Sequence, residues 1–267
     1  MARATETGEI VRYEKEWVTQ RGRAIGWITL NRPEVLNAYN VQMRDDLHEV
    51  LRAVHDDPDV AVVVLRGAGR AFCAGADLTE FGTAPSPTIA RKLRFARDVW
   101  HMLRTVSCPV IASLHGHVLG GGMEMAMLCD VRIASDDTKL RLPDVRLGMI
   151  PVATASQTLP RICGLASALD LVLTARVMSA REAQAAGILA EVVPRAALDR
   201  ATRRLAESLA ARSSFAQCQL KAVIRMTDAL SGNEARRVER HIWELSQKGE
   251  EEGSAALTRI AACFDSR

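Results

Sequence analysis

Hydrophobic and polar residues follow different patterns in the two parts of the chain. In the first 150 residues, extended apolar runs typical of β-strands occur at 10–17, 24–31, 60–67, 109–116 and 130–137. Apolar residues recur at helical spacing at 41–57 and 88–106, and 121–129 is a short, almost wholly apolar segment that we expect to be helical. Because strand and helix patterns alternate, the sequence predicts an α/β fold whose parallel strands are joined by crossovers.

Strand patterns almost disappear after about residue 160. Helical patterns follow at 165–174, 179–187, 196–211, 214–230, 233–248 and 252–264, with one short extended run at 189–194. The segment 81–88 contains glycine and proline and is predicted to be a surface loop. We therefore expect an α/β core domain over 1–195 and a helical C-terminal region over 196–267.

Size and charge narrow the class of protein. A chain of 267 residues with 48% hydrophobic content can bury one large core. The formal net charge is only +3, and no stretch of Lys and Arg alternates with aromatic residues, so no nucleic-acid partner is expected. The polar first residues argue against a signal peptide, and no apolar stretch is long enough for a membrane span. We expect a cytoplasmic protein with no membrane partner.

The six cysteines are scattered, without a CxxC motif or a Cys/His ligand spacing: Cys73, Cys108, Cys129, Cys163, Cys218 and Cys263. Most of them lie among apolar residues, as in AFCAG and AMLCD. We interpret them as reduced thiols of the core and expect no metal site.

Three consecutive glycines in HVLGGGMEMAMLCD (117–130) are predicted to end an extended segment and to open the short apolar helix. Such a run leaves backbone N–H groups at a helix N-terminus pointing toward a ligand oxygen. A tight turn that allows close packing explains the glycines equally well. Glu124 favours a functional interpretation, because it is the only charged residue in the first two turns of an apolar helix. Such a carboxylate is either paired with an arginine or kept for proton transfer.

A second glycine element, RGAGRAFCAGADLTEF (66–81), follows an apolar strand. It lacks the spacing of a dinucleotide fingerprint, and no G-K-[ST] follows to complete a phosphate loop. The turn from Ala74 to Asp77 consists of small residues, so its backbone can approach a ligand closely. Asp77 can also serve as the N-cap of a following helix, and the two roles are compatible.

A third element is LRLPDVRLGMIP (140–151), where Asp144 directly follows a proline and precedes an apolar stretch. Taken alone, Asp144 is best explained as a helix cap or turn residue. Its functional interpretation depends on the residues that accompany it.

The three elements stand in a longer series of motifs that covers nearly the whole chain. The series is ITLNRPEVLNAYN (28–40), GRAFCAGADL (69–78), HGHVLGGGMEMAMLCDVRIAS (115–135), LPDVRLGMIP (142–151), LTARVMSAREAQAAGILAEVVP (173–194) and EEGSAALTRIAACF (251–264). In this order the motifs resemble the crotonase superfamily, the enoyl-CoA hydratase/isomerase family. The resemblance implies a crotonase-like spiral of ββα units with a helical C-terminal trimerisation region, assembled as a homotrimer or a dimer of trimers.

The resemblance also implies roles for particular residues. The backbone N–H groups of Ala76 and Gly121 would form an oxyanion hole for the thioester carbonyl, and the turn from Ala74 to Leu78 would hold the adenine and pantetheine of coenzyme A. The implied substrate-binding residues are therefore Ala74, Ala76, Asp77, Leu78 and Gly121. Glu124 and Asp144 occupy the positions of the two acids that hold a water in the hydratases. The implied reaction is hydration of an α,β-unsaturated acyl-CoA to the 3-hydroxyacyl-CoA, with coenzyme A as part of the substrate and no further cofactor.

Three features depart from the family pattern. Asp144 is one methylene shorter than the usual glutamate, and PVATASQTLPR (151–161) replaces a glycine-rich stretch near the expected acyl chain, which implies a narrower or differently shaped acyl pocket. His115 and His117 flank Gly116 in place of commoner residues; a structural role is favoured, although His117 near a thioester could titrate.

The alternatives left open are double-bond isomerisation, ring hydration, decarboxylation or thioester hydrolysis, because the superfamily shares the enolate and differs in a few pocket residues. A non-catalytic acyl-CoA-binding or nucleic-acid-associated homologue is a further alternative.

Overall fold

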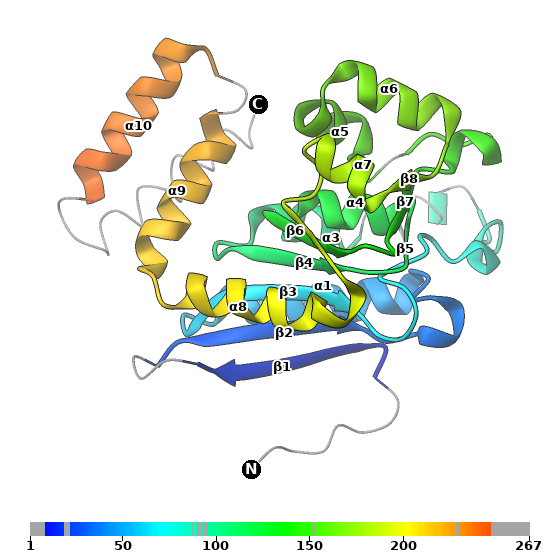
Figure 1. Cartoon of the computed structure of the whole chain (residues 1–267), viewed down its shortest axis with the longest axis horizontal. Coiled ribbons are helices and arrows are strands. Elements are labelled where there is room, and N and C mark those ends of the chain that lie inside the picture. Colours follow the sequence, from blue (N-terminus) through cyan, green and yellow to red (C-terminus); the bar gives the residue numbers. More distant parts are fainter. Residues whose placement is uncertain are drawn as a thin grey trace.

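The computed structural model describes residues 9–18, 22–86, 88–89, 92, 96–151, 153–227 and 230–246 (Figure 1). The helix predicted over 252–264, its motif at 251–264 and Cys263 lie outside the described residues. Among the helices within these ranges, none combines the length and the apolar character that crossing a bilayer requires.

The main sheet contains the five strands that the sequence predicted, at nearly the predicted positions, together with β9, which lies within the short extended run predicted at 189–194. Its order is β1 (Val11–Trp17), β2 (Ala24–Leu30), β3 (Val60–Gly67), β4 (Val110–Leu114), β6 (Val131–Ser135) and β9 (Glu191–Val193). From β2 onward neighbouring strands are parallel, as expected, whereas β1 pairs with β2 antiparallel. Strands β2 and β4 are buried along their whole length, as is usual for a parallel sheet covered on both faces.

A second, small sheet positions the functional segments. It consists of β5 (His117–Leu119), β7 (Lys139–Arg141) and β8 (Met178–Ser179), of which β5 and β7 are parallel. The sequence predicted an extended segment before the glycine triplet, where β5 lies, but it did not predict β7 or β8, because two or three residues are too few for a periodic pattern. The pairing of Leu119 with Arg141 brings the segment after Arg141 next to the glycine triplet.

Helices cover the main sheet and connect its strands (Figure 1). The bounds are α1 (Val41–Asp56), α3 (Val99–Thr105), α4 (Gly121–Leu128), α5 (Ala155–Cys163), α6 (Leu165–Thr174) and α7 (Ala180–Ala185), with short 3-10 helices η1 (Pro33–Val35), η2 (Leu78–Glu80), η3 (Asp144–Leu147) and η4 (Arg195–Ala197). Helix α1 begins where Asn40 Oδ1 accepts a hydrogen bond from the N–H of Met43. The sequence did not predict α5, which contains Pro160.

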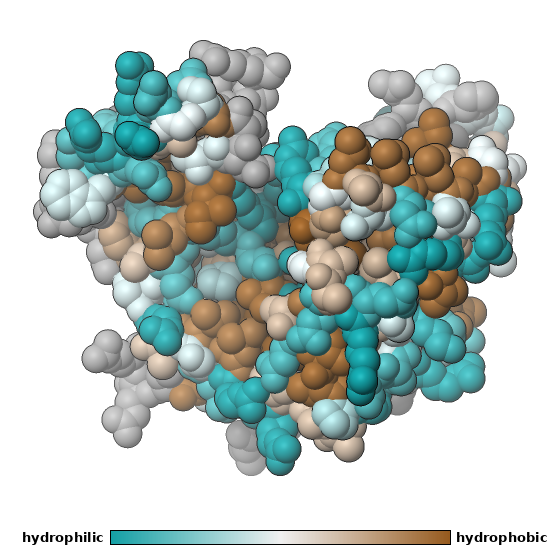
Figure 2. Space-filling view, turned by 45° about the horizontal axis from the view of Figure 1, so that its top comes forward, coloured by the Kyte–Doolittle hydropathy of each residue, from teal (hydrophilic) through white to brown (hydrophobic). Residues whose placement is uncertain are grey.

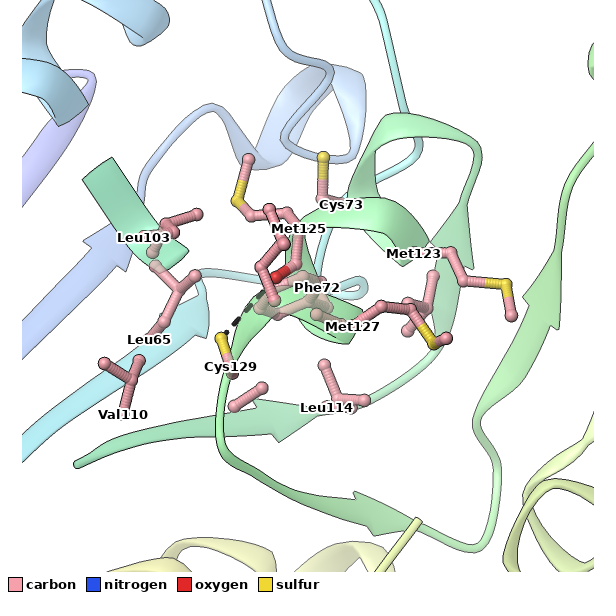
Figure 3. Close-up of a cluster of buried hydrophobic side chains, with 14 of the residues drawn as sticks. Leu65, Phe72, Cys73, Leu103, Val110, Leu114, Met123, Met125, Met127 and Cys129 are labelled. Atoms are coloured by element: carbon pink, nitrogen blue, oxygen red, sulfur yellow. Dashed lines mark hydrogen bonds between the residues drawn. The ribbon is translucent and has the colours of Figure 1, made fainter. Parts of the chain in front are cut away.

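Helix α4 lies in the centre of the core. Every residue from Gly122 to Leu128 is buried, including Glu124, so the helix has no solvent-exposed face. Figure 3 shows its three methionines, Met123, Met125 and Met127, among Leu65, Phe72, Leu103 and Leu114. Flexible methionine side chains fill irregular spaces around a short helix that is enclosed on all sides.

The cysteines that the structure describes are free thiols. Cys73, Cys108 and Cys129 are buried, and burial raises the pKa of the Cys73 thiol to about 11 and that of the other two to about 12. In the described part of the chain, no group of His, Cys, Asp and Glu side chains is arranged to hold a metal ion.

The C-terminal helices occupy two different places. Helix α8 (Leu198–Ala210) packs against the main sheet through Leu198, Ala201 and Ala206, while α9 (Ser214–Thr227) and α10 (Gly232–Ser246) pack against each other. Asp130 attaches α9 to the core, because its carboxylate oxygens lie 2.6 Å from Lys221 Nζ and 2.6 Å from Arg225 Nη2. The predicted division at residue 195 stays a prediction.

Candidate active site

The three elements that the sequence singled out separately lie against one another. A Cβ atom placed on Gly120 would lie 3.7 Å from Pro143 Cδ and 4.0 Å from Gly75 Cα. The N–H of Gly120 donates to the carbonyl oxygen of Arg141 at 2.9 Å, which fixes the same approach through the backbone. The turn around Gly75, the glycine triplet and the segment before Asp144 therefore surround one point of the molecule.

Two glycines of the triplet are required for this approach. Gly120 has φ 47° and ψ −123°, a mirror-β conformation that suits glycine. A Cβ on Gly122 would lie only 2.4 Å from the carbonyl oxygen of Cys73, so no larger residue fits without displacing α4. The tight turn with close packing, one of the two explanations offered from the sequence, is confirmed, and a role of these glycines in ligand binding stays a prediction.

Two backbone N–H groups, those of Ala76 and Gly121, lie close together where these segments meet. Gly121 is the first residue of α4, where the N–H has no intrahelical acceptor. Ala76 forms an isolated parallel β-bridge with Tyr39. In this bridge the N–H of Tyr39 donates to Gly75 O and the N–H of Asp77 donates to Tyr39 O, so the N–H of Ala76 takes part in neither hydrogen bond. A Cβ on Gly121 would lie 4.0 Å from the nitrogen of Ala76, so the two donors are close neighbours.

Asp77 is fixed by contacts within its own loop. Its carboxylate accepts hydrogen bonds from the backbone N–H and the hydroxyl of Thr79 and forms an ion pair with Arg32 at 2.9 Å. The Thr79 hydroxyl and then the Arg32 guanidinium hold the pKa of Asp77 below its usual value. Asp77 is the N-cap of η2, the second of its predicted roles, and the following Leu78 is 59% exposed.

Glu124 is only 3% exposed and accepts two backbone hydrogen bonds on the same oxygen. The N–H groups of Ala153 and Ala155 donate to Oε1 at 3.0 Å and 2.9 Å. From the sequence we expected either an arginine partner or a role in proton transfer. The structure pairs this carboxylate with the start of α5, a helix that the sequence had not predicted.

The residue between these two donors has an unusual backbone. Thr154 has φ 97° and ψ −7°, and this left-handed conformation makes the flanking N–H groups converge on Glu124 Oε1. A β-branched residue held in such a conformation costs ~1–3 kcal/mol. The Thr154 hydroxyl is also buried, and it has no hydrogen-bond partner among the described residues.

Asp144 begins η3 directly after Pro143 and is partly buried, with its Oδ2 atom shielded from solvent. The N–H of Met149 donates to the carbonyl oxygen of Asp144 at 2.9 Å and closes the short helical turn. Packing of Pro143 against Gly120 places Asp144 at the start of η3 beside the glycine triplet. The two predicted acids therefore lie on different segments, Glu124 in α4 and Asp144 in η3, and both segments begin beside the glycine triplet.

Comparison with known proteins identifies the family. Residues 20–259 match the family model described as enoyl-CoA hydratase/isomerase. The chain belongs to this family. It is 36% identical over 242 residues to a probable enoyl-CoA hydratase of Mycobacterium bovis, covering 90% of this chain and 93% of that protein. It is also 36% identical over 189 residues to the (E)-benzylidenesuccinyl-CoA hydratase of Thauera aromatica, covering 70% of this chain and 73% of that protein.

A solved structure of an enoyl-CoA hydratase subunit from Geobacillus kaustophilus has the same fold as this chain. The TM-score is 0.82 with 32% sequence identity, and the match covers 97% of this chain and 96% of that one. The crotonase-type fold implied by the sequence motifs is thereby confirmed.

Sequence analysis missed two aromatic residues of this enoyl-CoA hydratase/isomerase family member. The Tyr39 and Trp100 ring centroids lie 5.5 Å apart, and a Cβ on Gly121 would lie 3.6 Å from Trp100 Cη2. The Trp100 ring thus borders the space in front of one proposed oxyanion donor. Tyr39 belongs to a motif that had been noted, and Trp100 to a predicted helix, but only the structure shows that the two rings lie side by side.

Asn37 was also missed. It is fully buried, and its side chain accepts a hydrogen bond from the N–H of Arg32 and donates to the carbonyl oxygens of Ala68, Ala71 and Phe72. These bonds hold together the two loops that enter the site. A buried asparagine in the NRPEVLNAYN motif was the available signal.

The two histidines differ in environment. His115 is buried, with Nε2 3.0 Å from the carbonyl oxygen of Gly69, and burial lowers the pKa of its imidazole, so its role is structural as favoured from the sequence. His117 is exposed and lines a hollow of about 320 Å³ together with Leu36, Arg70, Gly116, Asp137 and Lys139.

Proposed function

We propose that this protein hydrates an α,β-unsaturated acyl-CoA to the 3-hydroxyacyl-CoA. The observation that supports this most directly is the arrangement of α4, whose first N–H lies beside that of Ala76 and whose first turn contains the buried carboxylate of Glu124. One helix thus joins a candidate oxyanion hole to a candidate acid/base group. The names of the relatives agree with this reaction.

In the proposed reaction, the thioester carbonyl oxygen accepts hydrogen bonds from the N–H groups of Ala76 and Gly121. When water adds to C3, negative charge develops on this oxygen as the enolate forms. Fixed donors in a buried site stabilise that charge more than they stabilise the neutral carbonyl, and one such donor is typically worth ~3 kcal/mol.

The proton inventory requires two carboxylates. The water oxygen bonds to C3 while one of its protons passes to a carboxylate, and the other carboxylate delivers a proton to C2. The N–H groups of Ala153 and Ala155 hold the Glu124 carboxylate in place through Oε1, and this carboxylate would exchange a proton with the water. Asp144 is the second acid, and its buried Oδ2 atom suits a site from which bulk water is excluded.

The turn from Ala74 to Leu78, with Gly121, would contact the coenzyme A part of the substrate. Asp77 would act through the loop that it caps, because Thr79 and Arg32 occupy its carboxylate. The exposed Leu78 side chain offers an apolar contact for adenine or pantetheine. Coenzyme A enters with the substrate, and the proposed steps use no other cofactor.

We also infer assembly into a homotrimer or a dimer of trimers. Leu165, Leu169 and Leu173 follow one another at one-turn intervals on α6 and are 66%, 47% and 65% exposed. Figure 2 shows the apolar surface over this helix at the upper right. A monomer rarely leaves such a stripe uncovered. Sedimentation in solution tests the assembly, and Leu169→Glu should shift it toward monomers. The cytoplasmic location stays a prediction.

The activity is tested by incubating the protein with a panel of acyl-CoA thioesters and measuring product mass. Gain of water supports hydration, whereas loss of carbon dioxide, release of free coenzyme A or an unchanged mass with a moved double bond indicates one of the alternatives. The panel includes crotonyl-CoA, whose absorbance falls on hydration, and cinnamoyl-CoA, because the Tyr39–Trp100 pair offers flat surfaces to an aryl group.

The acid/base assignment is tested by Glu124→Gln and Asp144→Asn. Each should lower hydration by at least the ~100-fold typical of losing a general acid or base, while saturated acyl-CoA still binds through the unchanged backbone donors. Full hydration by correctly folded Asp144→Asn would contradict the two-acid mechanism and favour an isomerase-like enzyme that uses Glu124 alone.

A further inference from the structure

The turn that holds Glu124 requires a left-handed residue at position 154, but it does not require a threonine. The positive φ makes the N–H groups of Ala153 and Ala155 converge on one carboxylate oxygen. Glycine adopts this conformation without steric conflict, whereas a β-branched residue there is a marked outlier. The backbone conformation of the turn therefore does not explain why residue 154 is a threonine.

The carbonyl oxygen of Thr154 has hydrogen-bond partners. It accepts from the N–H groups of Gln157 and Thr158 and from the Thr158 hydroxyl. The Thr154 hydroxyl is different, because Oγ1 is buried and has no partner among the residues described. A buried hydroxyl without a partner is unfavourable in the absence of a ligand or water.

The backbone around this hydroxyl suggests what it binds. The residues on both sides of Thr154 donate their N–H groups to Glu124, so the backbone of Thr154 lies beside the carboxylate that we assign to proton transfer. In the hydration reaction this neighbourhood holds the attacking water before the reaction and the C3 hydroxyl of the product afterwards. A hydroxyl group can both donate to and accept from either of these groups.

We propose that Thr154 is a third catalytic residue, whose hydroxyl holds the attacking water beside Glu124 and afterwards binds the C3 hydroxyl of the 3-hydroxyacyl-CoA. The proposal rests on the hydratase function. Thr154 transfers no proton in it: the hydrogen bond orients the water oxygen toward C3, and Glu124 and Asp144 remain the acid/base pair. The backbone strain at Thr154 is then explained, because binding the water requires a side chain at a position where glycine would adopt the backbone conformation without strain.

Three variants separate the hydroxyl from the backbone. Thr154→Val removes the hydroxyl and keeps the shape, Thr154→Ser keeps the hydroxyl, and Thr154→Gly removes the side chain and relieves the strain. With crotonyl-CoA, kcat/KM should fall roughly 10-fold in the valine and glycine variants, as expected for one lost hydrogen bond, and by less than about 3-fold in the serine variant. The Tm of Thr154→Gly should equal or exceed that of the wild type. Ser156→Ala, an exposed hydroxyl on the same helix, is the matched control and should change neither quantity.

Binding measured by calorimetry distinguishes this proposal from the hydratase function. Wild-type protein should bind 3-hydroxybutyryl-CoA more tightly than butyryl-CoA, and Thr154→Val should weaken only the former, by roughly 10-fold. If the wild type hydrates no thioester, the hydratase function fails while this binding difference still tests Thr154. Equal binding of the two thioesters by the wild type, or an unchanged preference together with unchanged kcat/KM in folded Thr154→Val, overturns the role of Thr154.

Discussion

Two turns of the site use left-handed backbone to bring N–H groups together, and they differ in the residues that adopt it. In the turns beside the candidate oxyanion hole, glycines occupy these positions: Gly75 with φ 96° and Gly120 with φ 47°. In the turn that binds Glu124, the position belongs to Thr154, with φ 97°. The turns beside the candidate oxyanion hole thus have no side chain at their left-handed positions, whereas the turn that binds Glu124 has a β-branched residue in a strained backbone conformation.

The packing around each turn explains the difference. A Cβ on Gly75 would lie 2.9 Å from the carbonyl oxygen of Leu119, so this turn has no room for a side chain, whereas at Gly120 the backbone conformation and not crowding favours glycine. The turn at 153–155 does accommodate one. Packing therefore excludes a side chain from the turn at Gly75, whereas the turn that binds Glu124 can carry one.

The largest effect should follow from forcing a side chain into the crowded turn. In Gly122→Ala, the new Cβ would lie 2.4 Å from Cys73 O and push α4 away, lowering the free energy of unfolding by ~1–3 kcal/mol and hydration by more than about 100-fold. Urea unfolding and crotonyl-CoA turnover measure the two effects.

Gly121→Ala is the matched control for this variant. Its Cβ meets Trp100 Cη2 at an ordinary 3.6 Å, so stability should stay within ~0.5 kcal/mol of the wild type. Equal destabilisation by the two substitutions would contradict the packing argument.

Removing one backbone donor should have the next largest effect. Ala76→Pro eliminates the N–H of residue 76, while the hydrogen bonds between Tyr39 and Gly75 and between Asp77 and Tyr39 do not involve that N–H. Hydration of every thioester tested should therefore fall by ~100- to 1,000-fold. Ala76→Ser keeps the N–H and should retain most of the activity. A folded proline variant with near-wild-type turnover would exclude Ala76 from the oxyanion hole.

A smaller effect is expected when the second acid is lengthened. Because Oδ2 of Asp144 is already buried, the extra methylene in Asp144→Glu should crowd the site and lower kcat/KM on the preferred substrate by roughly 10-fold. Steady-state kinetics on the thioester panel checks this. Preserved or increased crotonyl-CoA hydration would mean that the pocket is not built around the shorter side chain.

The smallest effect concerns pH. The pKa of Asp77 is lowered from 3.8 by the Thr79 hydroxyl and Arg32, so the folded state favours the ionised carboxylate. The stability that this provides is present above the unfolded-state pKa and is lost as pH falls through the folded-state value. Acid unfolding should therefore weaken the wild type more steeply below about pH 4 than it weakens Asp77→Asn. Parallel curves for the two proteins would show that the ion pair contributes nothing to the loop.

Long elements and single motifs were predictable because each depends on neighbouring residues. The strands at 60–67 and 109–116 and the helix at 165–174 have apolar patterns long enough to be unambiguous. The short strand β7 was not predictable, and neither was α5, whose polar first turn and internal Pro160 hide its helical pattern. These missed elements are the ones that bring Asp144 to the glycine triplet and Ala153 to Glu124.

By itself, the sequence determined the type of fold, the family, and the residues at which chemistry was expected, including Gly121, Glu124 and Asp144. The tertiary structure alone decided what these residues contact, including the two N–H groups on Glu124 Oε1, the Trp100 ring beside Gly121 and the strain at Thr154. The physical reason is that periodicity records which face of an element is buried. Convergence of backbone donors depends instead on dihedral angles and on contacts between segments far apart in the chain, which have no local pattern.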